Sequence, residues 1–337
     1  MNGHTTVVNT FVDTGRVNVN SQDNDGRTPL WWSVWNIYDQ TVAALVFRGK
    51  ADVHIRDNRG QTPLIWAVEN GRRDTVKMIL GLSTASINTK DHDGWTALSC
   101  AAHEGHEKIV EDLLVTGEVD IDPSNTRNDR MPLLWAAECE HEAVVTSLLD
   151  TGSFPINSKD SNGWTALSCA TRNGHLGVVQ VLLDTGKVDV NSRDNSNQTP
   201  LWWAVGNGHV DVVRMLLDKG SADVSLRDNC ARTPLLLATD IGDRHIVMML
   251  LDRDKTCVGS QDDEGRTPLL SAAANGRMDL VKLLLDTDGT YANLRDNSGR
   301  SPLSRAAESG HNDIVNILLD MKFKNAELIR LRESDRT

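Results

Sequence analysis

The octapeptide GWTALSCA occurs twice in the chain, at residues 94–101 and 163–170. Both copies hold a serine beside a cysteine, and both side chains can act as nucleophiles in enzymes. A nucleophile needs a base nearby and a group that orients the base, and neither copy provides a Gly-x-Ser-x-Gly elbow. The repetition therefore raises two interpretations: a duplicated chemical site, or a structural unit that the chain repeats.

The histidines invite a metal-binding interpretation, above all the stretch His103-Glu104-Gly105-His106. Zinc-binding helices place two histidines four residues apart and add further ligands. Here the spacing is three, across a glycine, and the chain contains no GxxxxGK[ST] phosphate loop. We therefore expect no catalytic residues, no metal and no cofactor, and a protein that is not an enzyme.

The composition is that of a folded protein, with 39% hydrophobic and 24% charged residues among 337. The net charge of −12 argues against nucleic acids and against a polybasic membrane anchor. No apolar stretch is long enough to span a bilayer, and the N-terminus does not resemble a signal peptide. The five cysteines are scattered, which favours a reducing cytoplasmic or nuclear setting.

A period of 34 residues organises the chain. The tripeptide Thr-Pro-Leu or a near relative marks it, and its leucine falls at Leu30, Leu64, Leu98, Leu133, Leu167, Leu201, Leu235, Leu269 and Leu303. One interval is 35 and the others are 34, so the 69-residue separation of the octapeptides is two repeats (35 + 34). The register runs through the whole chain without a linker.

Each position of the unit has a physical role. Thr-Pro starts a short helix with a cap, a small residue three positions after the leucine allows close packing, and a glycine four positions later ends the helix. A second helix follows, with apolar residues such as Val212, Val213, Leu216 and Leu217, and a projecting loop ends at an aspartate. Helix pairs this short bury their apolar faces only by stacking. Cys100 and Cys169 take a position that elsewhere holds tryptophan or leucine, so we expect them to pack rather than react.

The unit resembles the ankyrin repeat, as residues 194–224, DNSNQTPLWWAVGNGHVDVVRMLLDKGSADV, illustrate. The resemblance implies an all-α solenoid of paired antiparallel helices with β-turn-like projecting loops. It also implies that the histidine after the turn bridges adjacent loops. Partners would bind at the loop tips and at the concave face of the first helices.

The register divides the chain into an N-terminal half repeat at 1–22, nine repeats over 23–320 and a capping segment or tail at 321–337. The repeats start near residues 23, 57, 91, 126, 160, 194, 228, 262 and 296. The half repeat is either a cap or a sign that Met1 begins a fragment of a longer protein. The fourth repeat lacks the capping threonine, at Met131, and the helix-ending glycine, at Glu140. Stability is predicted to be lowest around residues 127–140.

Two sets of residues fall in the positions that the resemblance assigns to partners. Tryptophan is unusually frequent, with nine residues; Trp32, Trp66, Trp135 and Trp203 are expected to pack, while Trp35, Trp95 and Trp164 fall in variable positions. The arginines before the capping residue, with charged residues near the end of the first helix, complete the predicted set: Arg27, Arg130, Arg232, Arg266, Arg300, Glu69, Glu104 and Arg172. Tryptophan and arginine are enriched at interface hot spots. The alternative is that the arginines are common consensus residues and that the tryptophans only shield the loops.

The resulting hypothesis is a groove centred on repeats three to five that holds an extended or helical segment of a partner protein. The chain would then be a non-catalytic scaffold or adaptor, as a monomeric array. An alternative is that the array is the sensor or ligand-binding arm of a larger signalling protein with an upstream domain such as a NACHT NTPase.

Overall fold

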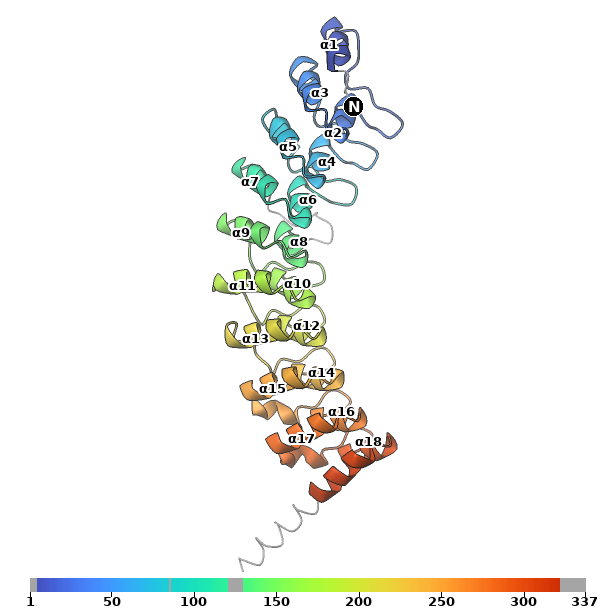
Figure 1. Ribbon diagram of the computed structural model, residues 1–337, viewed down its shortest axis with the longest axis vertical. Coiled ribbons are helices and arrows are strands. Elements are labelled where there is room, and N and C mark those ends of the chain that lie inside the picture. Colours follow the sequence, from blue (N-terminus) through green and yellow to red (C-terminus); the bar gives the residue numbers. More distant parts are fainter. Residues whose placement is uncertain (1–4, 85, 121–129, 322–337) are drawn as a thin grey trace, which may run out of the picture. The chain divides into compact units, whose positions relative to one another are not determined.

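The computed structural model describes residues 5–84, 86–120 and 130–321, and all the regular elements within these ranges are helical (Figure 1). The chain forms two compact units. Unit 1 comprises Met1–Ala170 with Asp184–Val188, and unit 2 comprises Thr171–Leu183 with Asp189–Thr337. Among the described helices, none has the length and apolar character needed to cross a membrane. The predicted all-α fold of paired helices is confirmed.

The first helix of each repeat, here called the inner helix, begins beside the marker leucine. The inner helices are α2 (Pro29–Trp35), α4 (Pro63–Glu69), α6 (Ala97–Glu104), α8 (Pro132–Glu138), α10 (Ala166–Asn173), α12 (Pro200–Gly206), α14 (Pro234–Ile241), α16 (Pro268–Ala274) and α18 (Pro302–Glu308). In unit 1, α2, α4, α6 and α8 contact one another in sequence, and α12, α14, α16 and α18 do so in unit 2. The inner rows bury the marker leucines of repeats one to eight, while Leu303 of α18 is half-buried.

The second helices form an outer row beside each inner row (Figure 1). They are α1 (Thr5–Thr14), α3 (Asp39–Ala43) continued by the π-helix η1 (Ala44–Arg48), α5 (Arg73–Leu80), α7 (Glu107–Val115), α9 (Glu142–Asp150), α11 (Leu176–Asp184), α13 (Val210–Asp218), α15 (Arg244–Arg253), α17 (Met278–Thr287) and a helical run at 312–321. Short 3-10 helices follow two of them, η3 (Lys255–Gly259) and η4 (Gly289–Asn293). The predicted C-terminal segment at 321–337 lies outside the described residues after Met321.

Side-chain caps start the inner helices, as the Thr-Pro signal predicts. The Thr62 hydroxyl accepts a hydrogen bond from the backbone N–H of Ile65 at 3.3 Å, which satisfies one of the free donors of the first turn. Equivalent bonds start α2, α6, α12, α14, α16 and α18. Met131 makes no such bond at α8, so the predicted loss of this cap is confirmed.

The loops form tight turns that bond to the turn of the adjacent repeat. Within the loop of the second repeat, the Asp57 N–H donates to the Gln61 carbonyl at 2.9 Å and the Gly60 N–H donates to the Asp57 carbonyl at 2.9 Å. The Asn58 N–H then donates to the Asp25 carbonyl of the first repeat at 2.9 Å. Such bonds fix the turns of adjacent repeats beside each other.

The recurrent histidine joins consecutive repeats. His141 Nε2 lies 2.9 Å from the His103 carbonyl oxygen, His209 Nε2 lies 3.0 Å from that of Arg172, and His311 Nε2 lies 3.1 Å from that of Ala274. The structural role implied by the family resemblance is therefore confirmed for these three side chains. At Gly105, φ is +75° and the His141 ring lies against the glycine, so a side chain there would be both strained and obstructed.

Candidate functional site

The aspartate that ends each loop uses one carboxylate oxygen to hold the turn. Asp57 Oδ1 accepts the N–H groups of Arg59 and Gln61, both at 2.9 Å. Asp91 repeats the pattern with Asp93 and Trp95. The second oxygen, Oδ2, takes no part in the turn, so its surroundings differ from one repeat to another.

In six repeats Oδ2 has a partner within its own unit. An arginine of the same repeat reaches it in repeats seven to nine: Arg232 to Asp228, Arg266 to Asp262 and Arg300 to Asp296, at 2.7–3.1 Å. A tryptophan N–H donates to it in repeats one and six: Trp32 to Asp23 at 2.8 Å and Trp203 to Asp194 at 3.1 Å. Arg130 reaches Asp160 at 3.6 Å. The three arginines of unit 2 are therefore tied to the framework and only partly exposed.

Burial of Arg130 revises the expectation that its side chain lies at an accessible surface. Arg130 is only 5% exposed and lies over the Trp135 ring, with its Cζ 4.4 Å from the ring centroid. It pairs with Glu138 and Asp160 and donates to Cys169 Sγ at 3.1 Å. The guanidinium joins repeats four and five from inside, where a partner does not reach it.

The cysteines of the repeated octapeptide are buried as packing residues. Burial raises the pKa of Cys169 to about 12. Burial, and then the charges of Glu69, Asp91 and Glu104, raise the pKa of Cys100 well above its usual value. Both thiols are therefore protonated at neutral pH, which disfavours a nucleophilic role.

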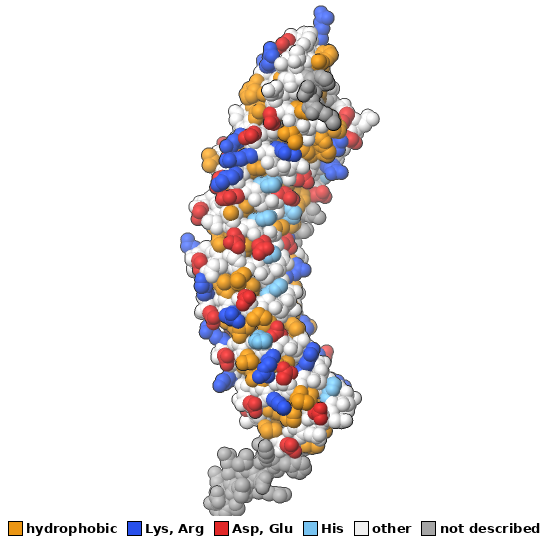
Figure 2. All heavy atoms as spheres, viewed as in Figure 1, with side chains coloured by type: hydrophobic (Ala, Val, Ile, Leu, Met, Phe, Trp, Pro, Cys, Tyr) orange, Lys and Arg blue, Asp and Glu red, His pale blue; other side chains and the backbone are white. Residues whose placement is uncertain are grey.

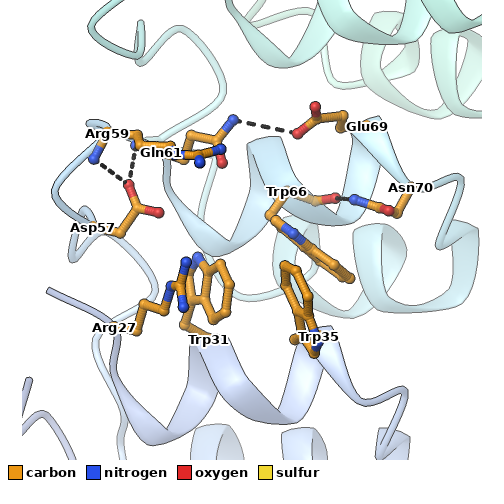
Figure 3. A pocket seen from close by; sticks show the side chains of 9 residues that line it. All are labelled: Arg27, Trp31, Trp35, Asp57, Arg59, Gln61, Trp66, Glu69 and Asn70. Carbon is orange, nitrogen blue, oxygen red and sulfur yellow. Dashed lines mark hydrogen bonds between the residues drawn. The ribbon is translucent and has the colours of Figure 1, made fainter. Parts of the chain in front are cut away.

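A pocket of about 260 Å³ lies between the first two loops and their inner helices (Figure 3). We call it the tryptophan pocket. Its lining is Arg27, Trp31, Trp35, Asp57, Arg59, Gln61, Trp66, Glu69 and Asn70. It combines a wall of indole rings with charged side chains from two successive repeats.

The indole rings of this pocket form one stacked cluster. The centroid of the Trp35 ring lies 5.1 Å from that of Trp31 and 5.1 Å from that of Trp66. Trp31 and Trp66 are buried, whereas Trp35 is 46% exposed and offers an apolar surface to a ligand. The Arg27 Cζ lies 4.3 Å from the Trp31 ring centroid, and Arg27 pairs with Asp25 at 3.1 Å.

A second pocket of about 180 Å³ adjoins the first, because Gln61 and Glu69 line both. Its other lining residues are Asp91, Trp95, Cys100, His103 and Glu104, and we call it the acidic pocket. The Trp95 ring stands 4.7 Å from Trp135 and 5.2 Å from His103, centroid to centroid. Three of the seven lining residues are carboxylates and none is lysine or arginine.

The predicted partner residues thus do not form one site. Five of them line the two adjoining pockets of unit 1: Arg27, Trp35, Glu69, Trp95 and Glu104. Trp164 is half-buried in repeat five, and in unit 2 the Arg172 Cζ lies over the Trp203 ring at 5.4 Å. Trp66 and Trp135 are buried as expected, but Trp32 is 39% exposed and Trp203 half-buried.

Sequence reasoning did not select the other lining residues, among them Asp57, Asp91 and Gln61. Asp57 and Asp91 belong to the repeated framework, so their residue type gives no sign of a site. The absence of an arginine four residues after the aspartate was a partial signal, because it marks Asp57 and Asp91 but also Asp160 and Asp194, which Arg130 and Trp203 reach.

Comparison with family models gives matches that together run from residue 38 to 328. The model is that of ankyrin repeats in three copies, and it matches residues 38–125, 82–157, 112–194, 133–228, 185–260 and 235–328. A comparison with curated proteins finds no match. With most of its length matched, and with the period, caps and bridging histidines described above, the chain belongs to the ankyrin repeat family.

Proposed function

We propose that the chain is a non-catalytic scaffold or adaptor that binds a protein partner across the tryptophan and acidic pockets. Ankyrin repeats are in general protein–protein interaction modules. The observation that carries the proposal is the continuity of the two pockets through Gln61 and Glu69. Together they offer the exposed indole of Trp35 beside charged side chains, and tryptophan is enriched at interface hot spots.

This proposal moves the centre of the groove from repeats three to five toward repeats one to three. Trp95 stays within it, and Trp35 takes the place that the sequence-based hypothesis gave to Trp164. The mixed charges on the face drawn in Figure 2, where acidic and basic side chains are interspersed, suit a protein partner better than a polyanion.

Selection of peptides from a displayed random library on the full chain tests the proposal. We expect the selected peptides to lose most of their affinity for Trp35→Ala and for Trp95→Ala. Phe47→Ala is the matched control, because Phe47 is an exposed aromatic residue (63%) on the outer helix η1, away from both pockets. Selected peptides that bind both tryptophan variants with unchanged affinity would overturn the proposal.

A further inference from the structure

Asp57 and Asp91 differ from the equivalent aspartates of the other described repeats. Within the described residues, no hydrogen bond or ion pair reaches the Oδ2 atom of either one. The position four residues later, which supplies arginine in repeats seven to nine, holds Gln61 and Trp95. Both aspartates line a pocket, Asp57 the tryptophan pocket and Asp91 the acidic pocket.

Asp57 is the more deeply buried of the two, with 7% of its surface exposed. Its second oxygen points into the tryptophan pocket (Figure 3). A buried carboxylate is stable when a cation or hydrogen-bond donor faces it, and costs free energy otherwise. The chain provides such a group in six repeats and omits it in these two.

We infer that the two pockets each receive an arginine side chain of the partner, which pairs with Asp91 in the acidic pocket and with Asp57 in the tryptophan pocket. This inference rests on the proposed function and specifies the chemistry of the partner.

Two arginines of the chain show how a guanidinium pairs with a loop aspartate. Arg266 approaches Asp262 Oδ2 with both Nε and Nη2 at 2.8 Å. Arg130 approaches Asp160 while its plane lies over Trp135. A planar guanidinium can pair with a carboxylate and stack on an indole at once, which an ammonium does less well. The acidic pocket offers the same two groups in Asp91 and Trp95.

The surrounding charges predict that the two pockets differ in affinity for an arginine side chain. In the acidic pocket Glu69 and Glu104 add to Asp91, so a cation meets three carboxylates. In the tryptophan pocket Arg27 and Arg59 offset Asp57 and Glu69. The acidic pocket therefore binds its arginine more strongly, and the tryptophan pocket binds the second one more weakly.

The repeat spacing limits the partner's sequence. Adjacent inner helices pack about 8–10 Å apart, so the two aspartates are separated by about that distance. In a polyproline II segment, residues three apart project on the same side and are separated by about 9 Å. The expected ligand is an extended Arg-x-x-Arg segment.

The test uses a fluorescein-labelled peptide, Gly-Pro-Arg-Pro-Pro-Arg-Pro-Gly, titrated with the full chain by fluorescence anisotropy. We expect replacement of both arginines by citrulline, a neutral isostere, to abolish binding, and replacement by lysine to weaken it severalfold. Equal binding of the arginine and citrulline peptides, or no binding of the arginine peptide, would overturn the inference.

Protein variants locate the two arginines. We expect Asp91→Asn to weaken binding about tenfold and Asp57→Asn a few-fold, because the amide keeps an oxygen for the turn but loses the charge. Asp262→Asn is the matched control, since Arg266 already occupies that aspartate, and should leave affinity unchanged. An unchanged affinity for Asp91→Asn contradicts the inference. Should that variant unfold, Glu104→Gln and Glu69→Gln replace it and should each weaken binding.

The two proposals fail in different ways. Library peptides that need Trp35 and Trp95 but carry no arginine would refute the inference and leave the proposed groove intact. Peptides that bind Trp35→Ala and Trp95→Ala with unchanged affinity would refute the proposed groove, whether or not the arginine peptide binds.

Discussion

In repeats seven to nine, the arginine before the capping residue folds back onto the aspartate of its own loop. In repeats two and three the same position holds Gln61 and Trp95, the aspartate oxygen faces a pocket, and the neighbouring surface is aromatic and acidic. In these five repeats the residue four positions after the aspartate separates the two outcomes, whereas in repeats one, five and six Trp32, Arg130 and Trp203 reach the aspartate instead. An array can thus gain a binding site by omitting a framework contact.

The strongest test of the internal cations is Arg130→Ala. Removing this buried guanidinium takes away the cation that pairs with both Glu138 and Asp160, and breaking a buried pair costs about 3–5 kcal/mol. We expect hydrogen exchange to accelerate in repeat four and in the part of repeat five that belongs to unit 1. Arg232→Ala, whose arginine is more exposed, should have a much smaller effect on its own repeat. Equal effects would show that burial does not set the strength of these pairs.

Gln61→Arg gives repeat two an arginine at the position that supplies one in repeats seven to nine. The new arginine should pair with Asp57 as Arg266 pairs with Asp262, and should reduce the affinity for the Arg-x-x-Arg peptide by about tenfold through lost charge and occupied space. Gln198→Arg places the same change in repeat six, where Trp203 already serves Asp194. If both variants bind the peptide with the affinity of the parent chain, an arginine at this position does not affect recognition of the peptide.

Glu140→Gly restores the helix-ending glycine that the fourth repeat lacks. Glu140 adopts φ of +65° where most repeats have glycine, and the left-handed conformation costs a residue with a side chain about 1–2 kcal/mol. We expect slower hydrogen exchange at the end of α8, with a gain of about 1 kcal/mol. Glu142→Gly, at the first residue of helix α9, should destabilise instead, because it removes a negative charge from the helix N-terminus. The stability minimum predicted at residues 127–140 remains a prediction, and residues 127–129 lie outside the described part of the chain.

The smallest expected effect is a pH dependence in repeat nine. Burial acts to raise the pKa of Asp296, but hydrogen bonds from Arg300 outweigh it and hold the pKa below its usual value. A lowered folded-state pKa stabilises the repeat above the unfolded pKa of about 3.9, and this stabilisation is lost as pH falls through the folded value. Acid titration followed by NMR of the Asp296 carboxyl measures the pKa directly. In Arg300→Gln it should move toward the usual value, and no movement would exclude Arg300 as the cause.

The positions of the helices and caps follow from local chemistry, which explains why the sequence predicted them. Thr62 starts a helix wherever it stands before Pro63, and Gly105 ends one because of its own backbone freedom. The failure of the cap at Met131 was visible for the same reason. Packing of Cys100 and Cys169 followed from the exchange of cysteine with tryptophan and leucine at one position of the repeat.

The site was only partly predictable. Arg130 and Arg27 occupy the same repeat position, yet one is buried among Glu138, Asp160 and Cys169 and the other lines a pocket. The difference depends in part on Asp160 and Cys169, which lie 30 and 39 positions after Arg130 and which an alignment of single repeats does not include. Trp35 was selected from sequence, but the ring cluster that supports it comes from two repeats.

The sequence by itself determined the period, the pairing of helices and their caps, because each depends on residues within one turn or one repeat, and the family resemblance supplied the bridging role of the histidines. The tertiary structure alone decided which framework aspartates keep an accessible oxygen and which neighbouring side chains surround it. That outcome depends on side-chain conformations within a repeat and on contacts across repeats such as Arg130–Asp160, where a carboxylate, an indole and a guanidinium compete for the same space.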